Sequence, residues 1–191
     1  VDPETGMLYV PSHNHAVVIS LYEPDPALGA TVAYTHGAPE ADRLAGRGVA
    51  PSRRGALMPQ GLPLLKPPYG KITAIDLNTG KHLWWIPNGD TPYFVKNHKA
   101  LQGVDVGNTG QRAHATALVT KSLLMFAEGR GGRSIWYAVD KVTGERLGAV
   151  EIPAPTSTAP MTYMHDGVQY IVLPIAGNGI PGSLVALRLE G

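Results

Sequence analysis

The chain has 191 residues, of which 43% are hydrophobic, with 16 Lys and Arg residues against 15 Asp and Glu residues and a formal net charge of +1. This composition is typical of one sizeable folded core and excludes a mostly disordered chain. No basic run is longer than Arg53–Arg54, and no apolar run approaches the roughly 20 residues of a membrane-spanning helix, so we expect no nucleic-acid groove and no transmembrane helix.

Glycine and proline are unusually frequent, with 23 Gly and 17 Pro, which favours short strands and turns over long helices. The sequence contains no cysteine, which excludes disulfides, thiolate metal sites and covalent attachment of c-type haem. Residues 1–10 have no charged start followed by an apolar segment, so we expect no signal peptide in this stretch.

Strand-like runs follow one another along the chain, each short, rich in β-branched or aromatic residues, and bounded by Gly, Asn, Asp or Pro. No segment holds an apolar period of about 3.6 residues, so almost no helix is expected. The sequence therefore predicts an all-β fold. The predicted strands are residues 7–10, 16–22, 71–77, 81–87, 115–120, 122–128, 134–140, 145–153, 159–165, 168–177 and 183–189.

Two regions, residues 72–87 and 136–153, share one pattern. In each, an apolar strand ends in Ala-x-Asp, a Thr-Gly turn follows, and a second apolar strand ends in Ile-Pro. Asp76 and Asp140 can bond the backbone of their own turn, and glycine takes the position with φ > 0, so the pattern predicts two β-hairpins. Two or three strands precede each hairpin, which gives the spacing of four-stranded β-propeller blades.

The strand pattern lapses over about residues 23–69, which are rich in Pro, Gly and Ala. A linker is one interpretation of this stretch. We favour an insertion folded over a face of the propeller, because the stretch lies between strands that should pair in one blade. The chain is then a single partial β-propeller domain over residues 1–191 that carries this insertion.

The strands add up to an incomplete blade over residues 7–87, a complete blade over 115–153 and a three-stranded blade over 159–189. The first blade lacks a clear innermost strand, and the last lacks its outer strand. A closed propeller usually needs about four to eight blades, so these roughly two and a half blades predict the C-terminal part of something larger.

Three segments, Gly6–Asn14, Lys66–Pro92 and Ala159–Gly177, carry a resemblance to a known family. Through them the chain resembles the C-terminal third of a pyrroloquinoline quinone (PQQ)-dependent dehydrogenase of the eight-bladed quinoprotein type. Within that type it is most similar to the membrane-type glucose and quinate dehydrogenase branch. The resemblance covers the chain except for parts of residues 23–60.

The resemblance implies a function for the complete protein. Family members hold PQQ on the propeller axis beside Ca²⁺ and oxidise a sugar, cyclitol or alcohol, and the electrons leave to a quinone or a cytochrome. The location implied is the periplasm or the periplasmic face of the inner membrane. The family's catalytic Asp and Ca²⁺ ligands fall in earlier blades, so no catalytic residue and no metal ligand is assigned here. We therefore expect the isolated chain to be inactive without the missing N-terminal blades.

The resemblance also implies which residues contact PQQ. Asn14 stands where the family has a PQQ-contacting Asn, and Gly177, Asn178 and Gly179 stand where it has a Gly-rich turn near the quinone. The sequence departs from the family at Ile180, where some relatives carry Trp. The alternative for both sites is structural: a polar strand end at Asn14, and a tight turn in which glycine adopts φ > 0.

Histidines near the start of the chain have weaker functional interpretations. His13 and His15 point to the same face of a strand, as metal ligands can, but no third ligand is evident. His114 precedes an innermost strand and can face the axial channel, although a solvated or core histidine is the alternative.

Charged and aromatic clusters have mainly structural interpretations. Glu128, Arg130 and Arg133 lie in or beside a Gly-rich segment, which predicts a solvated turn. Trp84 and Trp85 fall on opposite faces of one strand, so at most one of them faces a neighbouring blade, and blade-to-blade packing is preferred over a stacking platform for a ligand.

A second hypothesis is a non-enzymatic scaffold whose exposed blade edges pair with another copy or with a separate chain. An upstream sequence that carries the catalytic Asp and the Ca²⁺ ligands favours the enzyme. The absence of such a sequence favours the scaffold.

Overall fold

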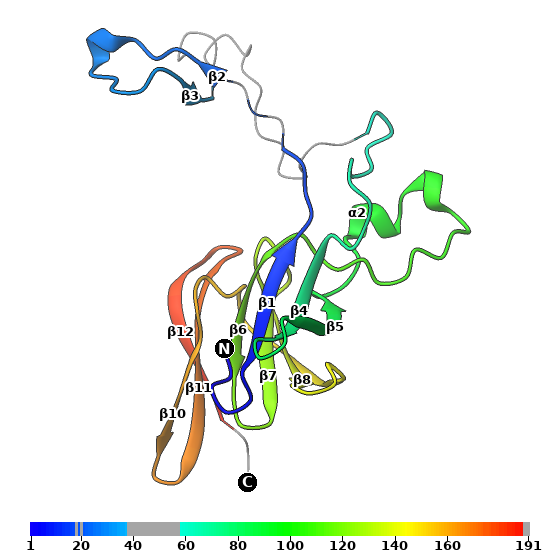
Figure 1. Cartoon of the computed structure of the whole chain (residues 1–191), viewed down its shortest axis with the longest axis vertical. Coiled ribbons are helices and arrows are strands. Elements are labelled where there is room, and N and C mark those ends of the chain that lie inside the picture. The colour runs from blue at the N-terminus through cyan, green and yellow to red at the C-terminus, as the bar shows by residue number, and fades with distance from the viewer. Residues whose placement is uncertain (18, 20, 38–57, 189–191) are drawn as a thin grey trace. The chain divides into compact units, whose positions relative to one another are not determined.

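The computed structural model describes residues 1–17, 19, 21–37 and 58–188 (Figure 1). The chain forms two compact units: Val1–Asn14 joins Pro67–Gly191 in the first, and His15–Lys66 forms the second. No helix in the described part of the chain is long and apolar enough to cross a membrane.

The first unit contains three antiparallel sheets that follow one another along the chain (Figure 1). A four-stranded sheet follows one three-stranded sheet and precedes another, which confirms the predicted all-β partial propeller. The first sheet has the order β1-β4-β5, with β1 Met7–His13, β4 Gly70–Asp76 and β5 Lys81–Pro87. The second is β6-β7-β8-β9, with β6 His114–Val119, β7 Leu123–Arg130, β8 Ile135–Asp140 and β9 Arg146–Glu151. The third is β10-β11-β12, with β10 Met161–His165, β11 Val168–Gly177 and β12 Ile180–Arg188.

The two predicted hairpins form as expected from their Asp-x-x-Thr-Gly sequences. Asp76 Oδ1 accepts the backbone N–H of Asn78 at 2.8 Å, and Asp76 Oδ2 accepts the Thr79 hydroxyl at 2.7 Å. These hydrogen bonds, that from Thr79 foremost, lower the pKa of Asp76. Asp140 accepts the backbone N–H of Val142 in the same way at 2.8 Å. Each carboxylate therefore fixes the turn that lets the next strand pair back.

The same turn occurs a third time at residues 2–6, where the sequence reads Asp-Pro-Glu-Thr-Gly. Asp2 accepts the backbone N–H of Glu4 at 3.1 Å and the Thr5 hydroxyl at 2.7 Å, and Gly6 N donates to the Asp2 carbonyl at 2.9 Å. The sequence pattern used above requires an apolar strand before and after the turn. It misses this copy, because only Val1 precedes Asp2 in the sequence. The turn leads directly into β1.

Asp2 also joins the first sheet to the second. Lys141 Nζ lies 2.6 Å from Asp2 Oδ2, and these side chains are only 8% and 4% exposed. The hydrogen bond from Lys141 is the main cause that lowers the pKa of Asp2 to about 2. The Tyr9 hydroxyl donates to the Lys141 carbonyl at 2.9 Å, which adds a second link between the sheets. Since an unpaired buried charge is costly, the ion pair fixes the spacing of the two sheets.

Two hydrophobic clusters hold the three sheets together. Leu124 and Phe126 of β7 pack with Ile72 and other residues of the first sheet, whereas Met125 and Ala127 of the same strand pack with residues of the third. The alternation follows from the two-residue period of a strand, since successive side chains point to opposite faces. Burying a side chain of this size contributes roughly 1.5–3 kcal/mol, so both faces of the second sheet contribute to stability.

The tryptophans divide between a packed and an exposed face, as the sequence predicts. Trp84 packs against the cluster between the first and second sheets. Trp85 is 52% exposed, and the Lys71 ammonium lies 5.9 Å from the centre of its ring. Trp136 of β8 is buried in the cluster between the second and third sheets. Packing between blades is therefore confirmed for Trp84, and Trp136 packs between blades in the same way.

The second unit contains a short hairpin of β2 Leu21–Tyr22 with β3 Thr35–His36. A 3₁₀ turn, Pro26–Leu28, lies between them and is capped by Asp25, whose carboxylate accepts Ala27 N–H at 2.9 Å. The predicted strand over 16–22 is wrong for residues 16, 17 and 19, while residues 18 and 20 lie outside the described part. Much of the stretch interpreted as an insertion, residues 38–57, also lies outside the described part, so that interpretation stays a prediction.

The connection from β5 to β6 contains one turn of helix, α2 Tyr93–Lys96, and a 3₁₀ turn, Lys99–Leu101.

Candidate functional site

The strands of the first unit end at two opposite edges of the sheets, which are named here by the residues found there. His13, the last residue of β1, pairs with Gly70, the first residue of β4. The His13 ring lies 5.4 Å, centroid to centroid, from the ring of His114, the first residue of β6, and His114 pairs with Arg130 at the end of β7. We term this end, where β1 and β7 finish and β4 and β6 begin, the rim. The Asp-x-x-Thr-Gly turns lie at the other end, termed the turn end.

A pocket of about 510 Å³ opens at the rim between the second and third sheets. Its walls come from three connections: the loop after β7, the segment between β9 and β10, and the turn after β11. The lining residues are Arg130, Gly131, Gly132, Pro155, Thr156, Ser157, Ala176, Gly177 and Asn178. We term this the rim pocket.

Short hydrogen bonds hold the wall segments of the rim pocket in place. Ser157 N–H donates to the Pro174 carbonyl of β11 at 2.9 Å. The hydroxyl oxygens of Thr116 in β6 and Thr156 lie 2.8 Å apart, and Thr156 is buried. The segment between β9 and β10 is therefore fixed to both the second and the third sheet, so the pocket is a preformed feature of the fold.

The structure places two of the four predicted cofactor residues in the rim pocket. Gly177 and Asn178 line it, and both have left-handed backbones, with φ of 115° and 54°. Gly179 continues the same turn with φ of 81° and is not among the lining residues. Asn14 is exposed at the rim of the first sheet, where its backbone N–H donates to the Tyr69 carbonyl at 2.9 Å. The four residues thus share one end of the sheets, and their contact with a cofactor stays a prediction.

The prediction of a solvated turn is wrong for Glu128, which is completely buried beside the rim pocket. Its carboxylate accepts the backbone N–H of Arg133 at 2.7 Å, the Arg133 side-chain Nε at 3.0 Å and the Tyr137 hydroxyl at 2.8 Å. Burial first, and then the hydrogen bond to Glu128, raise the pKa of Tyr137 to about 12. Asp90 of the preceding connection also reaches Arg133, at 3.3 Å.

Two glycines make room for the Glu128 side chain. A Cβ atom at Gly89 would lie 2.2 Å from Glu128 Oε1, and one at Gly132 would lie 2.3 Å from Glu128 Cβ. Glu128 therefore fixes the loop that supplies Gly132 to the rim pocket. Sequence reasoning missed this role, although the position of Glu128 at the end of an apolar run is a signal of burial.

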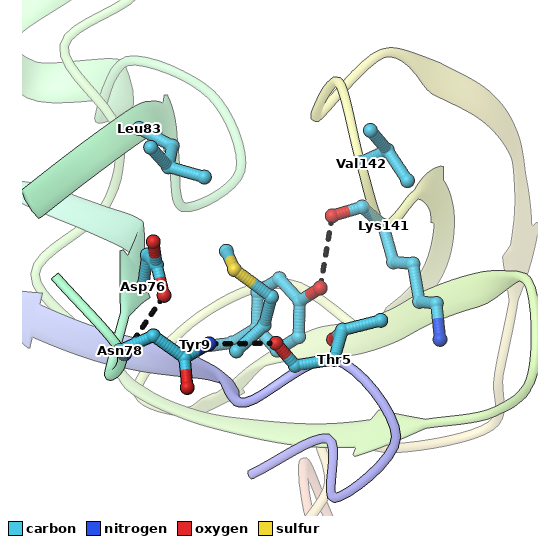
Figure 2. Close-up of a pocket in the computed structure, with 8 residues that line it drawn as sticks. Thr5, Tyr9, Asp76, Asn78, Leu83, Lys141 and Val142 are labelled. Atoms are coloured by element: carbon cyan, nitrogen blue, oxygen red, sulfur yellow. Dashed lines mark hydrogen bonds between the residues drawn. The ribbon is translucent and has the colours of Figure 1, made fainter.

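A second pocket, of about 270 Å³, lies at the turn end between the first two sheets. Figure 2 shows the Tyr9 side chain at its centre and the hydrogen bond from the Tyr9 hydroxyl to the Lys141 carbonyl. The Asn78 side chain donates to the Thr5 carbonyl at 3.3 Å across the same pocket (Figure 2). Asp76 is used within its own turn. This pocket therefore lies where the three copies of the turn meet.

The histidines near the rim do not form a metal cluster. Across the described ranges, no group of three or more His, Asp and Glu side chains could hold a metal ion. Burial first, and then electrostatic interactions with His114 and Arg112, lower the pKa of His13.

Comparison with known proteins gives a family match over most of the chain. The family described as PQQ, glucose/ethanol/alcohol dehydrogenase, beta-propeller domain, matches residues 1–171.

Several relatives match individually. A probable quinate dehydrogenase (quinone) from Xanthomonas campestris pv. juglandis is 31% identical over 142 residues, which cover 70% of this chain and 17% of the relative. Quinoprotein glucose dehydrogenase A from Acinetobacter calcoaceticus is 29% identical over 127 residues, with 66% and 15% covered. A quinohemoprotein alcohol dehydrogenase from Pseudomonas putida is 29% identical over 182 residues, with 93% and 20% covered.

The fold also matches a solved structure. Quinohemoprotein alcohol dehydrogenase from Comamonas testosteroni superimposes with a TM-score of 0.55 at 20% identity, over 98% of this chain and 24% of that one. This likeness shows the fold. The chain spans only 15% to 20% of the length of the three sequence relatives described above.

Proposed function

This chain belongs to the family of PQQ-dependent glucose, ethanol and alcohol dehydrogenase β-propeller domains, and on that premise we propose that it is the C-terminal portion of a dehydrogenase that oxidises a sugar, cyclitol or alcohol. In this proposal the electrons pass to a quinone or a cytochrome. This portion closes the propeller and lines part of the PQQ cavity. The observation that carries the proposal is the rim pocket, whose wall contains Gly177 and Asn178.

The rim pocket suits the edge of a planar cofactor that bears carbonyl and carboxylate groups. A Cβ atom added at Gly131 would meet nothing within 4 Å, so this part of the wall leaves space for a ligand. The Asn178 amide and the Arg130 guanidinium, both lining the pocket, are donors that carbonyl and carboxylate oxygens accept. When bound, PQQ supplies the quinone that takes up the hydride, while the protein supplies position and charge.

Each assigned residue has a physical task in this proposal. Gly177 and Gly179 lack side chains, so the backbone of their turn can approach a ligand closely. Asn178 and Asn14 supply amide groups that orient the cofactor through hydrogen bonds. The catalytic base and the Ca²⁺ ligands belong to earlier blades, so this chain binds and orients rather than transfers the proton.

The missing N-terminal blades are the partner that the proposal requires. The turn at residues 2–6 supports this part of the proposal. It has the hydrogen bonds of a hairpin turn, and β1 is the strand that follows it. A strand arriving at Asp2 would pair with β1 and supply the innermost strand of the first blade. The location proposed for the assembled protein is the periplasm or the periplasmic face of the inner membrane.

The substitution Asn178→Gly in the full natural polypeptide tests the cofactor site. It removes the amide and keeps the left-handed backbone, so we expect the fold to persist and the affinity for PQQ to fall by about 2- to 10-fold, as for loss of one hydrogen bond. The measurement is a PQQ titration of the cofactor-free protein, followed by dye reduction with glucose, quinate or an alcohol.

Asp166→Gly is the matched control. Asp166 is the other non-glycine residue with positive φ in the described chain, at 49°, and it lies at the turn end of the same sheet. We expect Asp166→Gly to leave PQQ affinity unchanged. Equal PQQ affinity in the two variants would contradict the assignment of Asn178, and failure of the full polypeptide to bind PQQ would overturn the proposed function.

One observation favours the scaffold alternative. Met161, Tyr163 and Leu184 share one face of the third sheet and are 53%, 42% and 72% exposed. Such a face can dock on another copy or on another chain.

A further inference from the structure

The segment from Arg130, the last residue of β7, to Arg133 carries two arginines with different surroundings. The Arg133 guanidinium is held on two sides, with Nε 3.0 Å from Glu128 Oε1 and Nη1 3.3 Å from Asp90 Oδ2. Its Nη2 donates to the Tyr137 hydroxyl at 2.9 Å. Arg130 lines the rim pocket, and no described residue forms a hydrogen bond or an ion pair with its side chain. Arg133 is therefore structural, whereas the Arg130 guanidinium is available to a ligand.

The backbone on both sides of Arg130 is fixed. Arg130 pairs with His114 at the start of β6, and Gly132 N–H donates to the Gly129 carbonyl at 2.9 Å. Gly129 has a φ of 79°, and a Cβ atom there would lie 1.8 Å from the His114 carbonyl oxygen, so this residue touches β6 through its backbone. A ligand that binds Arg130 therefore has to order one side chain rather than a loop, which limits the entropic cost of binding.

Each of the other two walls of the rim pocket adds one polar side chain. Ser157 uses its backbone N–H to reach the Pro174 carbonyl, and its hydroxyl has no partner among the described residues. The Asn178 amide likewise has none in the described part of the chain. The buried Thr156 hydroxyl differs, because it already lies 2.8 Å from the Thr116 hydroxyl. Three side chains that can donate hydrogen bonds thus come from three separate connections.

The charge of the rim pocket is positive. Of the nine described residues that line it, Arg130 alone is charged, and the others are glycine, alanine, proline, serine, threonine and asparagine. Glu128 lies behind Gly132, but it is completely buried and its carboxylate is neutralised by Arg133. The pocket therefore favours a ligand group that is anionic and accepts several hydrogen bonds.

We propose that Arg130, Ser157 and Asn178 together bind a carboxylate group in the rim pocket. A guanidinium can donate two parallel hydrogen bonds to a carboxylate, and the hydroxyl and the amide add two neutral donors. The pocket volume of about 510 Å³ lies within the range of small-molecule sites, roughly 300–1,000 Å³. Neither the family match nor the names of the relatives assign Arg130 or Ser157 to a ligand.

The carboxylate has two sources that the test must distinguish. A hydroxy-acid substrate carries a carboxylate beside the alcohol to be oxidised, and PQQ itself carries carboxylates. Assigning the carboxylate to either ligand rests on the proposed function, whereas the binding of a carboxylate by Arg130 does not.

The test uses the full natural polypeptide and two matched probes. Benzoate presents a carboxylate without an alcohol that can be oxidised, and benzamide is its neutral counterpart. Calorimetric titration gives the Kd of each probe with the cofactor-free and the PQQ-loaded protein, and a separate titration gives the Kd of PQQ. The variants are Arg130→Gln, Arg130→Lys and Ser157→Ala.

We expect Arg130→Gln to weaken benzoate binding by about 10-fold or more, as for loss of a charged hydrogen bond, and to leave benzamide unaffected. Arg130→Lys keeps the charge but loses the paired donors, so it recovers only part of the affinity. Ser157→Ala removes one neutral donor and weakens benzoate binding by about 2- to 10-fold.

Arg188→Gln is the matched control. It also removes one exposed arginine, but Arg188 pairs with Tyr170 at the turn end of the third sheet, away from the rim pocket. We expect this variant to bind benzoate and PQQ as the unaltered protein does. Circular dichroism and the unfolding temperature identify any variant that fails to fold, and Arg130→Lys then carries the comparison.

The two titrations identify the source of the carboxylate. If PQQ blocks benzoate and Arg130→Gln weakens PQQ binding, the carboxylate belongs to the cofactor. If the PQQ-loaded protein binds benzoate through Arg130, the carboxylate belongs to the substrate, and the KM of a hydroxy acid rises in Arg130→Gln while that of a neutral alcohol does not. Unchanged affinities for benzoate and PQQ in folded variants would overturn the proposal. A protein that binds benzoate through Arg130 but binds no PQQ would retain this site while the proposed function fails.

Discussion

The three buried charged side chains that the structure describes, Asp2, Glu128 and Lys141, are all paired. Glu128 is fixed by three donor groups from Arg133 and Tyr137, and the Lys141 ammonium lies against the Asp2 carboxylate. Such a group stabilises the fold only while its partners are present, since removing a partner leaves an uncompensated charge in a low-dielectric interior. At the residue scale, the ion pair of Asp2 with Lys141 joins the sheets at the turn end, and Glu128 shapes the rim.

The depressed pKa of Asp2 predicts a pH dependence of stability. Folding lowers this pKa from 3.8 to about 2, so the stabilisation is fully present above pH 4 and is lost as the pH falls towards 2. We expect the Asp2→Asn variant to be less stable than the unaltered protein at pH 7 and to lose less stability between pH 4 and pH 2.

Thermal unfolding of both proteins across this pH range measures the effect. Asp166→Asn is the control, because Asp166 is an exposed turn carboxylate whose neighbour at 3.4 Å, His165, is also exposed. The interpretation is contradicted if Asp2→Asn and the unaltered protein lose stability in parallel as the pH falls.

At the scale of elements, one turn serves two tasks. Gly80 and Gly144 occupy the same place in two copies of the turn, with φ of 71° and 78°. A Cβ atom at Gly80 would meet nothing within 4 Å, whereas one at Gly144 would lie 2.9 Å from Trp84 Cε3 and 3.1 Å from Ile86 Cγ2. The second turn is therefore also a contact between neighbouring sheets.

The matched substitutions Gly80→Ala and Gly144→Ala separate these two tasks. Both place alanine in the left-handed region, which costs roughly 1–2 kcal/mol. The alanine side chain of Gly144→Ala would in addition clash with the Trp84 ring, so we expect this variant to lose a further 1–3 kcal/mol or so of folding stability. Chemical denaturation of the two variants gives the difference. Equal losses of stability would contradict the contact between Gly144 and Trp84.

The sequence predicts most strands because their boundaries are local. Glycine, asparagine and aspartate mark the turns at 76–80 and 140–144, and alternating apolar residues mark the faces. The run over 16–22 is rich in β-branched residues, yet only Leu21–Tyr22 forms a strand among its described residues. A strand requires a partner, and local composition does not specify one.

The candidate site is less predictable from local sequence. Gly177 and Asn178 are recognised through the family resemblance, and the structure adds that they line a pocket. The burial of Glu128 depends on Gly89, which belongs to a different connection. The contact of His13 with His114 joins residues that are far apart in sequence, and local sequence does not specify it.

At the scale of the whole first unit, three sheets are joined by two hydrophobic clusters, and the outer sheets each retain one face outside these clusters. On the third sheet this face carries Met161, Tyr163 and Leu184, and Tyr163 stacks on Tyr170 with a ring separation of 5.3 Å. In the complete protein we expect another blade to cover it, since exposed apolar sheet faces promote association.

The isolated 191-residue chain is therefore expected to be inactive and to self-associate through this face. Leu184→Lys places a charge at its most exposed position, at 72%, and should shift the chain towards monomer. Val142→Lys, at a similarly exposed turn position, is the control and should leave association unchanged. Sedimentation velocity over a range of concentrations measures the effect, and a wild-type chain that stays monomeric throughout would contradict it.

The alternation along β7 has a consequence for how this protein can change over evolution. Leu124 and Phe126 belong to one intersheet cluster, whereas Met125 and Ala127 belong to the other. Substitutions at adjacent positions of β7 therefore affect different hydrophobic clusters, whereas substitutions two positions apart affect the same cluster. Compensating substitutions can therefore accumulate in one intersheet cluster largely independently of the other. The sequence of such a propeller can diverge one interface at a time while the backbones of the strands are conserved.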